Sequence, residues 1–369
     1  MKIAFYNLTT TTKAGGIETF NWEMAGTLAS RGHTVHIYGG EGEALRETPA
    51  NVEVYQYSFI RRESVPDLGT RFRKFVERLT FGTHALRYLV KRNYDYIYIS
   101  KPYDLPIALI VSKWTGAKVI FGSQGTEFFP GYKYLAKRVS YFFSCSEFNA
   151  GQIDQYCKIR PRVLPNGVNT GLFRPHFPDQ EIKHNLKISD TDHIIISACR
   201  LIGWKGIQYS IKAAAELISR GYAIKYLIIG DGEYAEDLSL LVKKLKVEDN
   251  VIFLGNKRNS ELPGYYSVAG IAVFPSVADE TFGIAIAEAM ACGLSVVSTA
   301  VGGIPEVIAK DTGILVPPKN EKALVDVIEQ LMLDDDLRGR MGNRASRHIS
   351  ENFNWANIAG KFERYLNNE

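Results

Sequence analysis

The chain has few cysteines and no long apolar run, and these absences exclude several classes of protein. Its 369 residues include four cysteines, widely scattered and without a C-x-x-C pair, which argues against zinc fingers, redox dithiols and a disulfide framework. Its apolar runs, such as 105–111 and 271–274, fall far short of the ~18 residues that suggest a membrane-spanning helix. We therefore expect free thiols and no membrane-spanning segment.

A strong net charge and abundant proline are also lacking. The formal net charge is only +4, too small to demand a nucleic-acid partner, so none is expected. With 14 prolines and 46% hydrophobic residues, the composition is that of a globular protein without a large disordered part. The first residues enter an apolar strand pattern with no signal peptide before it, from which we expect a cytoplasmic protein.

Short apolar runs alternate with helical patterns along nearly the whole chain, which is typical of βαβ units around parallel sheets. A polar stretch at 9–13, expected to be a loop, follows the first of these runs. One series has strands expected at 2–7, 34–38, 52–57, 96–100, 118–122 and 141–145. The second has strands expected at 193–199, 225–229, 251–254, 272–275, 295–298 and 313–316.

These two series predict an α/β protein with two doubly wound, Rossmann-like domains. The expected boundaries are 1–168 for the first domain, 169–352 for the second, and 353–369 for a helix that returns to the first domain. Because open parallel sheets bind ligands at the carboxyl ends of their strands, the two domains are expected to face each other across a substrate cleft.

The strongest motif runs from 275 to 293 and reads as a strand end, a loop and a helix that stops at Gly293. Two carboxylates, Glu280 and Glu288, stand eight residues apart in it. Glu288 lies in a helix that is otherwise mostly apolar, so a vicinal diol such as ribose is a sensible partner, and Glu280 outside the helix can reach a sugar. Backbone amides at the start of the helix suit a diphosphate, namely those of Phe282, Gly283 and Ile284.

Here the sequence resembles the retaining glycosyltransferases of family 4, which have the GT-B fold and the E-x7-E signature that Glu280 and Glu288 match. The resemblance covers nearly the whole chain. Its further segments are Gly15-Gly16 with Glu18, Asn166-Gly167-Val168, Arg200 with Lys205-Gly206, Gly230-Asp231-Gly232 and Gly302-Gly303-Ile304-Pro305-Glu306.

The resemblance implies transfer of a hexosyl or N-acetylhexosaminyl group, with retention, from a UDP- or GDP-sugar donor to a glycan or lipid-linked acceptor. It implies that Glu280 contacts the donor sugar, that Glu288 binds the ribose, and that Arg200 and Lys205 neutralise the diphosphate. Glu280, Arg200 and Lys205 are thus the expected catalytic group. Two fixed cations beside the leaving diphosphate would stabilise its departure, so neither a metal nor a cofactor is expected.

The remaining candidates lie in the loops at strand ends. Gly16, Gln124 and Gly230 are expected on the donor side, and Gly15 and Glu127 on the acceptor side. Many relatives have His where this chain has Gln124, and an amide can donate a hydrogen bond to the sugar but cannot titrate.

Two alternatives remain open. An NAD-dependent Rossmann dehydrogenase would use the first strand, glycine loop and helix, although Gly15-Gly16 is not the G-x-G-x-x-G fingerprint. A non-catalytic subunit that binds nucleotide sugars is the other, and the four charged residues of the site argue against it.

A basic and aromatic segment at 57–92 points to an acceptor at a membrane. Its cations outnumber its acids and are Arg61, Arg62, Arg71, Arg73, Lys74, Arg78, Arg87, Lys91 and Arg92. Apolar and aromatic residues alternate with them, and a second such stretch runs from 132 to 142. This pattern suits peripheral docking on an anionic membrane surface, at the inner face of the membrane, and the competing interpretation is ordinary packing with solvent-facing charge.

Overall fold

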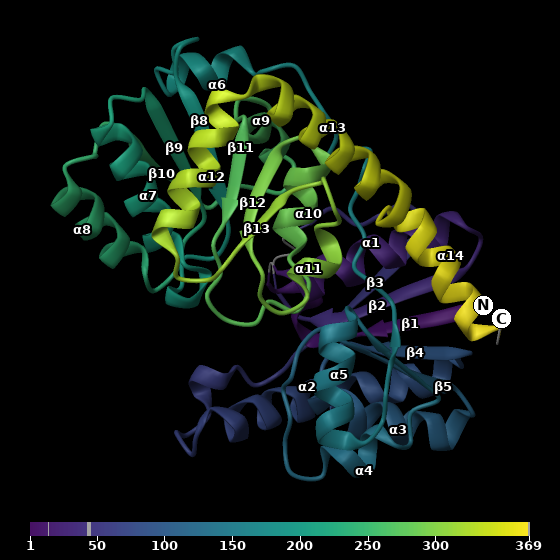
Figure 1. The fold of residues 1–369 in the computed structure, drawn as a ribbon. Helices are drawn as coiled ribbons and strands as arrows, with labels where there is room; N and C mark the ends of the chain where they lie inside the picture. Colours follow the sequence, from purple (N-terminus) through teal and green to yellow (C-terminus); the bar gives the residue numbers. More distant parts are fainter. Residues whose placement is uncertain (14, 43–45, 368–369) are drawn as a thin grey trace. The chain divides into compact units, whose positions relative to one another are not determined.

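The computed structural model describes residues 1–13, 15–42 and 46–367. The chain divides into two compact units, Met1–Gly167 with Trp355–Glu369, and Val168–Asn354. Each unit is a parallel sheet with helices on both faces (Figure 1). Residues 368–369, the end of the segment expected to return to the first domain, lie outside the described part.

In the part of the first unit that the structure describes, seven parallel strands form one sheet in the order β3-β2-β1-β4-β5-β6-β7. The strands are β1 (Lys2–Tyr6), β2 (Thr34–Gly40), β3 (Val52–Tyr57), β4 (Tyr96–Ile99), β5 (Lys118–Ser123), β6 (Tyr141–Ser144) and β7 (Arg162–Val163). The apolar runs predicted the first six because such runs are buried on both faces of a parallel sheet. The two-residue strand β7 was not predicted.

Helices cover both faces of this sheet (Figure 1). On one face pack α2 (Thr70–Arg92), α3 (Leu105–Thr115), α4 (Tyr132–Ala136) and α5 (Glu147–Cys157). The other face carries α1 (Gly16–Ser30) and the C-terminal helix α14 (Trp355–Leu366). Helix α14 buries Trp355, Ile358 and Phe362 beside Phe20 of α1, so the end of the chain is part of the first core.

The polar stretch after β1 is not the loop that its composition suggested. Residues Leu8–Thr11 form a 3₁₀ helix, η1, and all four are buried. Their hydroxyls are satisfied inside the fold, since Thr10 Oγ1 accepts hydrogen bonds from the amides of Asn7 (2.9 Å) and Asn21 (2.8 Å). Buried polar groups are tolerated when hydrogen-bonded, so a run of threonines fills a core position here. Two more short 3₁₀ turns in this unit are η2 (Arg62–Ser64) and η3 (Pro102–Asp104).

In the second unit, six parallel strands among the described residues follow the order β10-β9-β8-β11-β12-β13. They are β8 (His193–Ala198), β9 (Ile224–Ile229), β10 (Val251–Gly255), β11 (Ile271–Phe274), β12 (Ser295–Thr299) and β13 (Ile314–Val316). Every strand predicted in this unit is present, with ends that differ by one residue at most.

The helices of the second unit complete its doubly wound fold. They are α6 (Gln180–Asn185), α7 (Ile207–Ser219), α8 (Ala235–Leu245), α9 (Leu262–Ser267), α10 (Ile284–Ala291), α11 (Ile304–Val307), α12 (Glu321–Leu333) and α13 (Asp335–Asn352), with the 3₁₀ turn η4 (Gly203–Lys205). Helices α7, α8 and α12 share one core with the sheet, and α10 packs against α13. No helix in the described ranges has both the length and the apolar character needed to cross a membrane.

Candidate active site

The strand order of each sheet fixes where a ligand can bind. In the second unit the order reverses between β8 and β11, which are hydrogen-bonded neighbours. Loops that leave the carboxyl ends of two such strands go to opposite faces and open a crevice between them. Arg200 and Lys205 follow β8, and Glu280 follows β11, so the predicted diphosphate and sugar residues flank this point.

Lys205 and Glu280 meet directly at this crevice. The Lys205 ammonium donates a hydrogen bond to Glu280 Oε2 and forms an ion pair with it. Both side chains are mostly buried, with 20% and 17% of their surfaces exposed. Because both groups remain partly exposed, a ligand can displace this ion pair. A diphosphate would then bind the ammonium, and a sugar hydroxyl would bind the carboxylate.

Glycines let the two loops approach each other at this pair. A Cβ on Gly206, which has φ +75°, would lie 1.9 Å from the carbonyl oxygen of Pro275, in the loop that carries Glu280. A Cβ on Gly302, at φ +59°, would lie 2.1 Å from the carbonyl oxygen of Glu280 itself. Gly303 also donates its amide hydrogen to that carbonyl at 2.7 Å. The Gly302-Gly303 pair therefore fixes the position of the Glu280 backbone. These two glycines were not assigned to the site from the sequence.

Helix α10 presents its first turn to the same edge of the sheet. Its N-cap is Gly283 at φ +94°, which brings no side chain to cap the first amides. Phe282 is buried with its ring against Phe353, at 5.7 Å between centroids, so only its backbone can serve a ligand. Ile284 is half-buried at the first helical position. The three predicted amides thus lie at a helix N-terminus whose partial positive charge favours anions.

Glu288 lies one turn into α10 and is 7% exposed. Burial raises the pKa of the nearby Cys292 thiol to about 12, and the Glu288 carboxylate adds to the shift. A carboxylate this deep in an apolar helix retains little contact with water, so a hydroxyl-rich ligand at the helix would find a strong acceptor.

Arg200 and Gly230 complete the predicted residues of this unit. Arg200 is exposed and forms no ion pair within the described ranges, so its charge is available to an anion. Gly230 packs on the end of β8, where a Cβ would lie 1.9 Å from the carbonyl oxygen of Cys199. Burial raises the pKa of the Cys199 thiol to about 11, while the nearby Lys205 ammonium opposes that shift. Cys199 thus lies near both members of the charged pair.

In the first unit, Gly15 and Gly16 begin α1 at the carboxyl end of β1, which is the point where this sheet reverses its order. Both are exposed. A Cβ on Gly15 would lie 2.7 Å from Glu18 Oε2, and Glu18 Oε1 accepts a 2.5 Å hydrogen bond from the Thr9 hydroxyl. The Glu18 carboxylate therefore already occupies space beside this helix N-terminus.

Gln124 and Glu127 follow β5 in the same unit and are both half-buried. The Glu127 carboxylate accepts hydrogen bonds from Lys74 at 3.0 Å and from Lys101 at 3.1 Å. Although burial acts to raise it, the two ammonium groups hold the pKa of Glu127 below its ordinary value. Glu127 thus ties α2 to the loop after β4, and its acceptor-side role stays a prediction.

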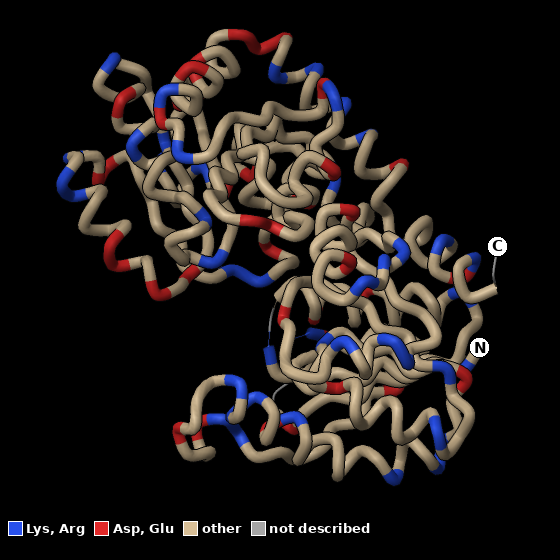
Figure 2. Tube along the Cα trace, turned by 60° about the horizontal axis from the view of Figure 1, so that its bottom comes forward, with Lys and Arg blue, Asp and Glu red and all other residues tan. Residues whose placement is uncertain are grey.

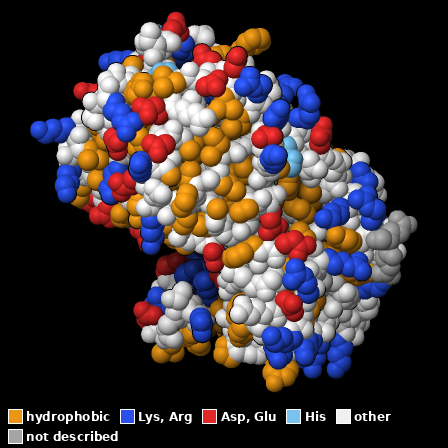
Figure 3. Space-filling view, viewed as in Figure 1, with side chains coloured by type: hydrophobic (Ala, Val, Ile, Leu, Met, Phe, Trp, Pro, Cys, Tyr) orange, Lys and Arg blue, Asp and Glu red, His pale blue; other side chains and the backbone are white. Residues whose placement is uncertain are grey.

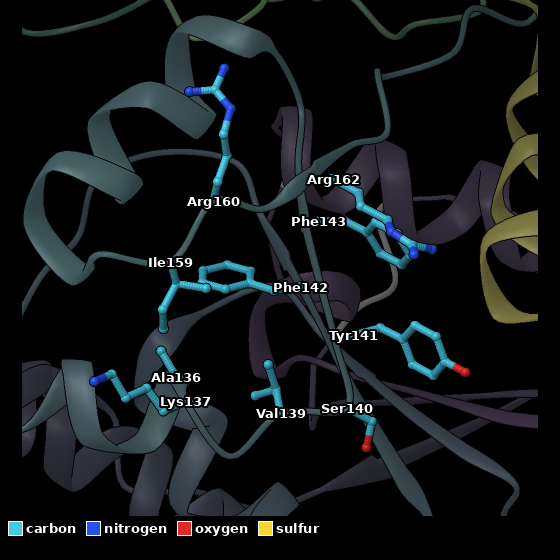
Figure 4. Close-up of a pocket in the computed structure, with 10 residues that line it drawn as sticks. All are labelled: Ala136, Lys137, Val139, Ser140, Tyr141, Phe142, Phe143, Ile159, Arg160 and Arg162. Carbon is cyan, nitrogen blue, oxygen red and sulfur yellow. The ribbon is translucent and has the colours of Figure 1, made fainter. Parts of the chain in front are cut away.

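A cavity of about 400 Å³ lies at the opposite edge of the first sheet, at the amino ends of β6 and β7 (Figure 4). Phe142 and Ile159 form part of its apolar floor. Its cations, Lys137, Arg160 and Arg162, point in different directions rather than toward one another (Figure 4). The second basic and aromatic stretch of the sequence thus lines a pocket apart from the strand-end loops.

One neighbour of the charged pair escaped sequence reasoning altogether. The ring of Trp204 lies 4.6 Å from the Lys205 ammonium, measured to the ring centroid. The only sequence signal was its place beside the predicted lysine.

Comparisons with known proteins identify the family of the chain. Residues 178–348 match the model of glycosyl transferases group 1, and residues 14–172 match that of glycosyltransferase family 4. The chain is 35% identical over 185 residues to the N-acetyl-alpha-D-glucosaminyl L-malate synthase of Bacillus anthracis, which covers 50% of this chain and 47% of the relative. The chain thus spans about half the length of this curated relative.

A second relative and one solved structure match more of the chain. The GDP-mannose-dependent monoacylated alpha-(1-6)-phosphatidylinositol monomannoside mannosyltransferase of Corynebacterium glutamicum is 26% identical over 306 residues, covering 78% of this chain and 80% of the relative. The structure of Anabaena HepE in complex with UDP-glucose superposes with a TM-score of 0.81 at 20% identity, covering 100% of both chains. With two doubly wound α/β units and matches in both halves, the chain belongs to the group 1 glycosyltransferases of family 4, which have the GT-B fold.

Proposed function

We propose that the protein is a retaining, metal-independent glycosyltransferase that moves a hexosyl or N-acetylhexosaminyl group from a UDP- or GDP-sugar to a glycan or lipid-linked acceptor. The observation that carries the proposal is the Lys205–Glu280 pair at the switch point of the second sheet, beside the uncapped start of α10. One cation, one carboxylate and a row of amides at one crevice suit a sugar diphosphate.

The donor is proposed to bind in the second unit. Lys205, Arg200 and the amides of residues 282–284 take the diphosphate, Glu280 takes sugar hydroxyls, and Glu288 takes the ribose. The printed names of the relatives support this class of donor, since one depends on GDP-mannose and HepE was crystallised with UDP-glucose.

The chemistry follows from where charge develops. As the bond between the sugar and the diphosphate breaks, negative charge grows on the leaving oxygen, and two fixed cations stabilise it there without a metal ion. In the proposed complex Glu280 binds sugar hydroxyls rather than the anomeric carbon, so the acceptor attacks on the face that the leaving group leaves, with net retention. Gln124 has no titratable group, so it can orient the sugar but cannot transfer a proton.

Donor binding and turnover test this proposal. A thermal-shift panel of UDP, GDP and their sugars should give one stabilising nucleotide, because a ligand that binds only the folded state raises the melting temperature. Lys205→Ala and Glu288→Ala should each weaken donor binding strongly without unfolding the protein, and EDTA should leave turnover unchanged. Full activity in both variants, or a loss on chelation that added metal restores, would refute the diphosphate chemistry.

Stereochemistry and turnover separate the remaining alternatives. The anomeric configuration of the product, read by NMR, should match that of the donor, and inversion would contradict the proposed mechanism. A non-catalytic subunit would bind the donor but neither hydrolyse nor transfer its sugar. An NAD-dependent dehydrogenase is set aside by the family to which the chain belongs.

On the acceptor side, we propose peripheral docking of the first unit on an anionic membrane surface at the cytoplasmic face. Electrostatic attraction should contribute less to this docking than the sequence suggests, because ion pairs with described residues neutralise much of the basic segment. Four cations are paired in this way: Arg62 with Glu77 (2.7 Å), Arg73 with Asp67 (3.6 Å), Lys74 with Glu127 (3.0 Å) and Arg78 with Asp104 (2.5 Å). Acidic and basic residues accordingly lie together around this segment (Figure 2).

Apolar exposure, in contrast, is greater than the alternative of simple core packing predicts. Phe72, Phe75 and Leu79 are each exposed by 40–42%, and Leu68 just before the helix is 71% exposed. Their spacing of three and four residues puts the helical three on one face of α2. Hydrophobic side chains reach the surface over this helix at the lower left of Figure 3. Such a face can enter the boundary between lipid headgroups and acyl chains.

Sedimentation with liposomes tests the docking. Binding to vesicles that contain anionic lipid should be lost in Phe72→Ser/Phe75→Ser and weakened in Arg61→Glu/Arg71→Glu, whose cations form no ion pair among the described residues. Leu240→Ser/Leu333→Ser, at exposed positions of the second unit, is the matched control. No binding of the wild type at low salt, or equal binding by all variants, would refute docking through α2.

A further inference from the structure

Trp204 gives Lys205 a second partner besides Glu280. The ring centroid lies 4.6 Å from the Lys205 ammonium, within the range of a cation–π interaction. The same ammonium forms the ion pair with Glu280. One partner thus carries a full negative charge, and the other carries none.

The backbone around Trp204 fixes the place of its ring. The Trp204 carbonyl accepts a 2.8 Å hydrogen bond from the amide of Val277, which lies in the loop after β11. Gly206, two residues later, packs against Pro275 of the same loop so closely that a Cβ has no room. The backbone of Trp204 is therefore held where the two loops of the crevice contact each other, and this restrains the position of its ring.

The two partners act differently when an anion arrives. Glu280 neutralises the ammonium, and their ion pair must break before Lys205 can bind a diphosphate. An aromatic face attracts the ammonium through its quadrupole and leaves the charge in place. A ring can therefore stay with the lysine while the carboxylate leaves, and it restrains a side chain that otherwise has a flexible four-carbon stem.

From this geometry we infer that Trp204 is a positioning residue for donor binding, which holds the Lys205 ammonium toward the donor diphosphate. The inference rests on the proposed function, because it takes the ligand of Lys205 to be the diphosphate of a nucleotide sugar. Trp204 acts through Lys205 and need not touch the donor.

Removal of the ring should weaken the binding of a nucleoside diphosphate by about three- to tenfold, the range expected for one partly desolvated cation–π contact. Trp204→Leu keeps an apolar side chain without the ring, and Trp204→Phe keeps a weaker ring, so the phenylalanine variant should recover most of the lost affinity. In turnover, the KM for the donor should rise more than kcat falls.

A double-mutant cycle with Lys205→Met separates positioning from a merely structural role. UDP and GDP are titrated by calorimetry into the wild type, Trp204→Leu, Lys205→Met and the double variant. Trp204→Leu should lose affinity in the wild-type background and change it by less than about 1.5-fold once Lys205 is gone. An equal loss in both backgrounds, or no loss in either, overturns the inference.

Tyr222→Leu is the matched control. Tyr222 is a half-buried aromatic residue of the same unit, and it lies at the amino end of β9, whereas the crevice lies at the carboxyl ends of the strands. Its affinity for the nucleotide should equal that of the wild type. If the wild type binds neither UDP nor GDP, the proposed function falls and this inference with it. If the wild type binds and only the coupling to Lys205 is absent, the role of Trp204 alone is refuted.

Discussion

Gly302→Ala should disable the sugar half of the donor site while sparing the nucleotide half. Gly302 adopts φ +59°, and an added Cβ would lie 2.1 Å from the carbonyl oxygen and 2.7 Å from the amide nitrogen of Glu280. Real Cβ atoms essentially never approach within 3.0 Å, so the two backbones must separate by about 1 Å. Because the obstacle is backbone rather than a flexible side chain, Glu280 itself has to move.

The structure sets the size of the effect. The left-handed conformation costs alanine about 1–2 kcal/mol of stability. A hydrogen bond to a charged group contributes about 1.5–3 kcal/mol, so a displaced Glu280 should bind the nucleotide sugar about 10- to 100-fold more weakly. The nucleoside diphosphate makes no contact with Glu280 in the proposed site, and a weaker Lys205–Glu280 ion pair would favour its binding, so its affinity should not fall by more than about threefold.

Calorimetry with the nucleotide sugar that stabilises the wild type, and with the corresponding nucleoside diphosphate, measures both affinities. Gly339→Ala in α13 is the control, because its added Cβ meets no atom within 4 Å and removal of a helical glycine should stabilise the fold by about 0.5–1 kcal/mol. Equal losses for both ligands, or no loss for the sugar, would refute the assignment of Glu280 to the donor sugar.

Three further perturbations test the packing and the charges. Gly342→Ala in α13 should destabilise the second unit by about 1–3 kcal/mol in thermal unfolding, because its Cβ would lie 2.0 Å from the carbonyl oxygen of Gly293; unchanged melting would contradict this. Cys199, whose pKa burial raises to about 11, should react with iodoacetamide slowly at pH 8, with a rate that mass spectrometry finds still rising above pH 9. Glu363, whose pKa the Arg31 hydrogen bond holds below the ordinary 4.5, should contribute about 1 kcal/mol to stability above that pH and lose it as the pH falls through the folded pKa. The melting temperatures of the wild type and Glu363→Gln should therefore differ at pH 7 and converge in acid, and curves that stay parallel would count against the ion pair.

Local patterns in the sequence determined most of the fold. Twelve strands could be predicted because each is a short run of apolar residues, and burial on both faces of a parallel sheet requires such runs. The E-x7-E motif placed Glu280 before α10 and Glu288 within it, since an apolar stretch that stops at Gly293 is typical of a short helix. Strand β7 was missed because two residues carry no periodicity.

Contacts between segments distant in the chain were decided only by the tertiary structure. The sequence shows that 57–92 is basic, but not that Lys74 would pair with Glu127, 53 residues away. The threonines after β1 look like a loop until the fold supplies Asn21 as a hydrogen-bond donor. Lys205 and Glu280 lie 75 residues apart, and they meet because parallel strands bring loops from their carboxyl ends to one edge. Residue types along the chain determine which segments are buried, whereas the partner of each charge depends on which loops the sheet order places together.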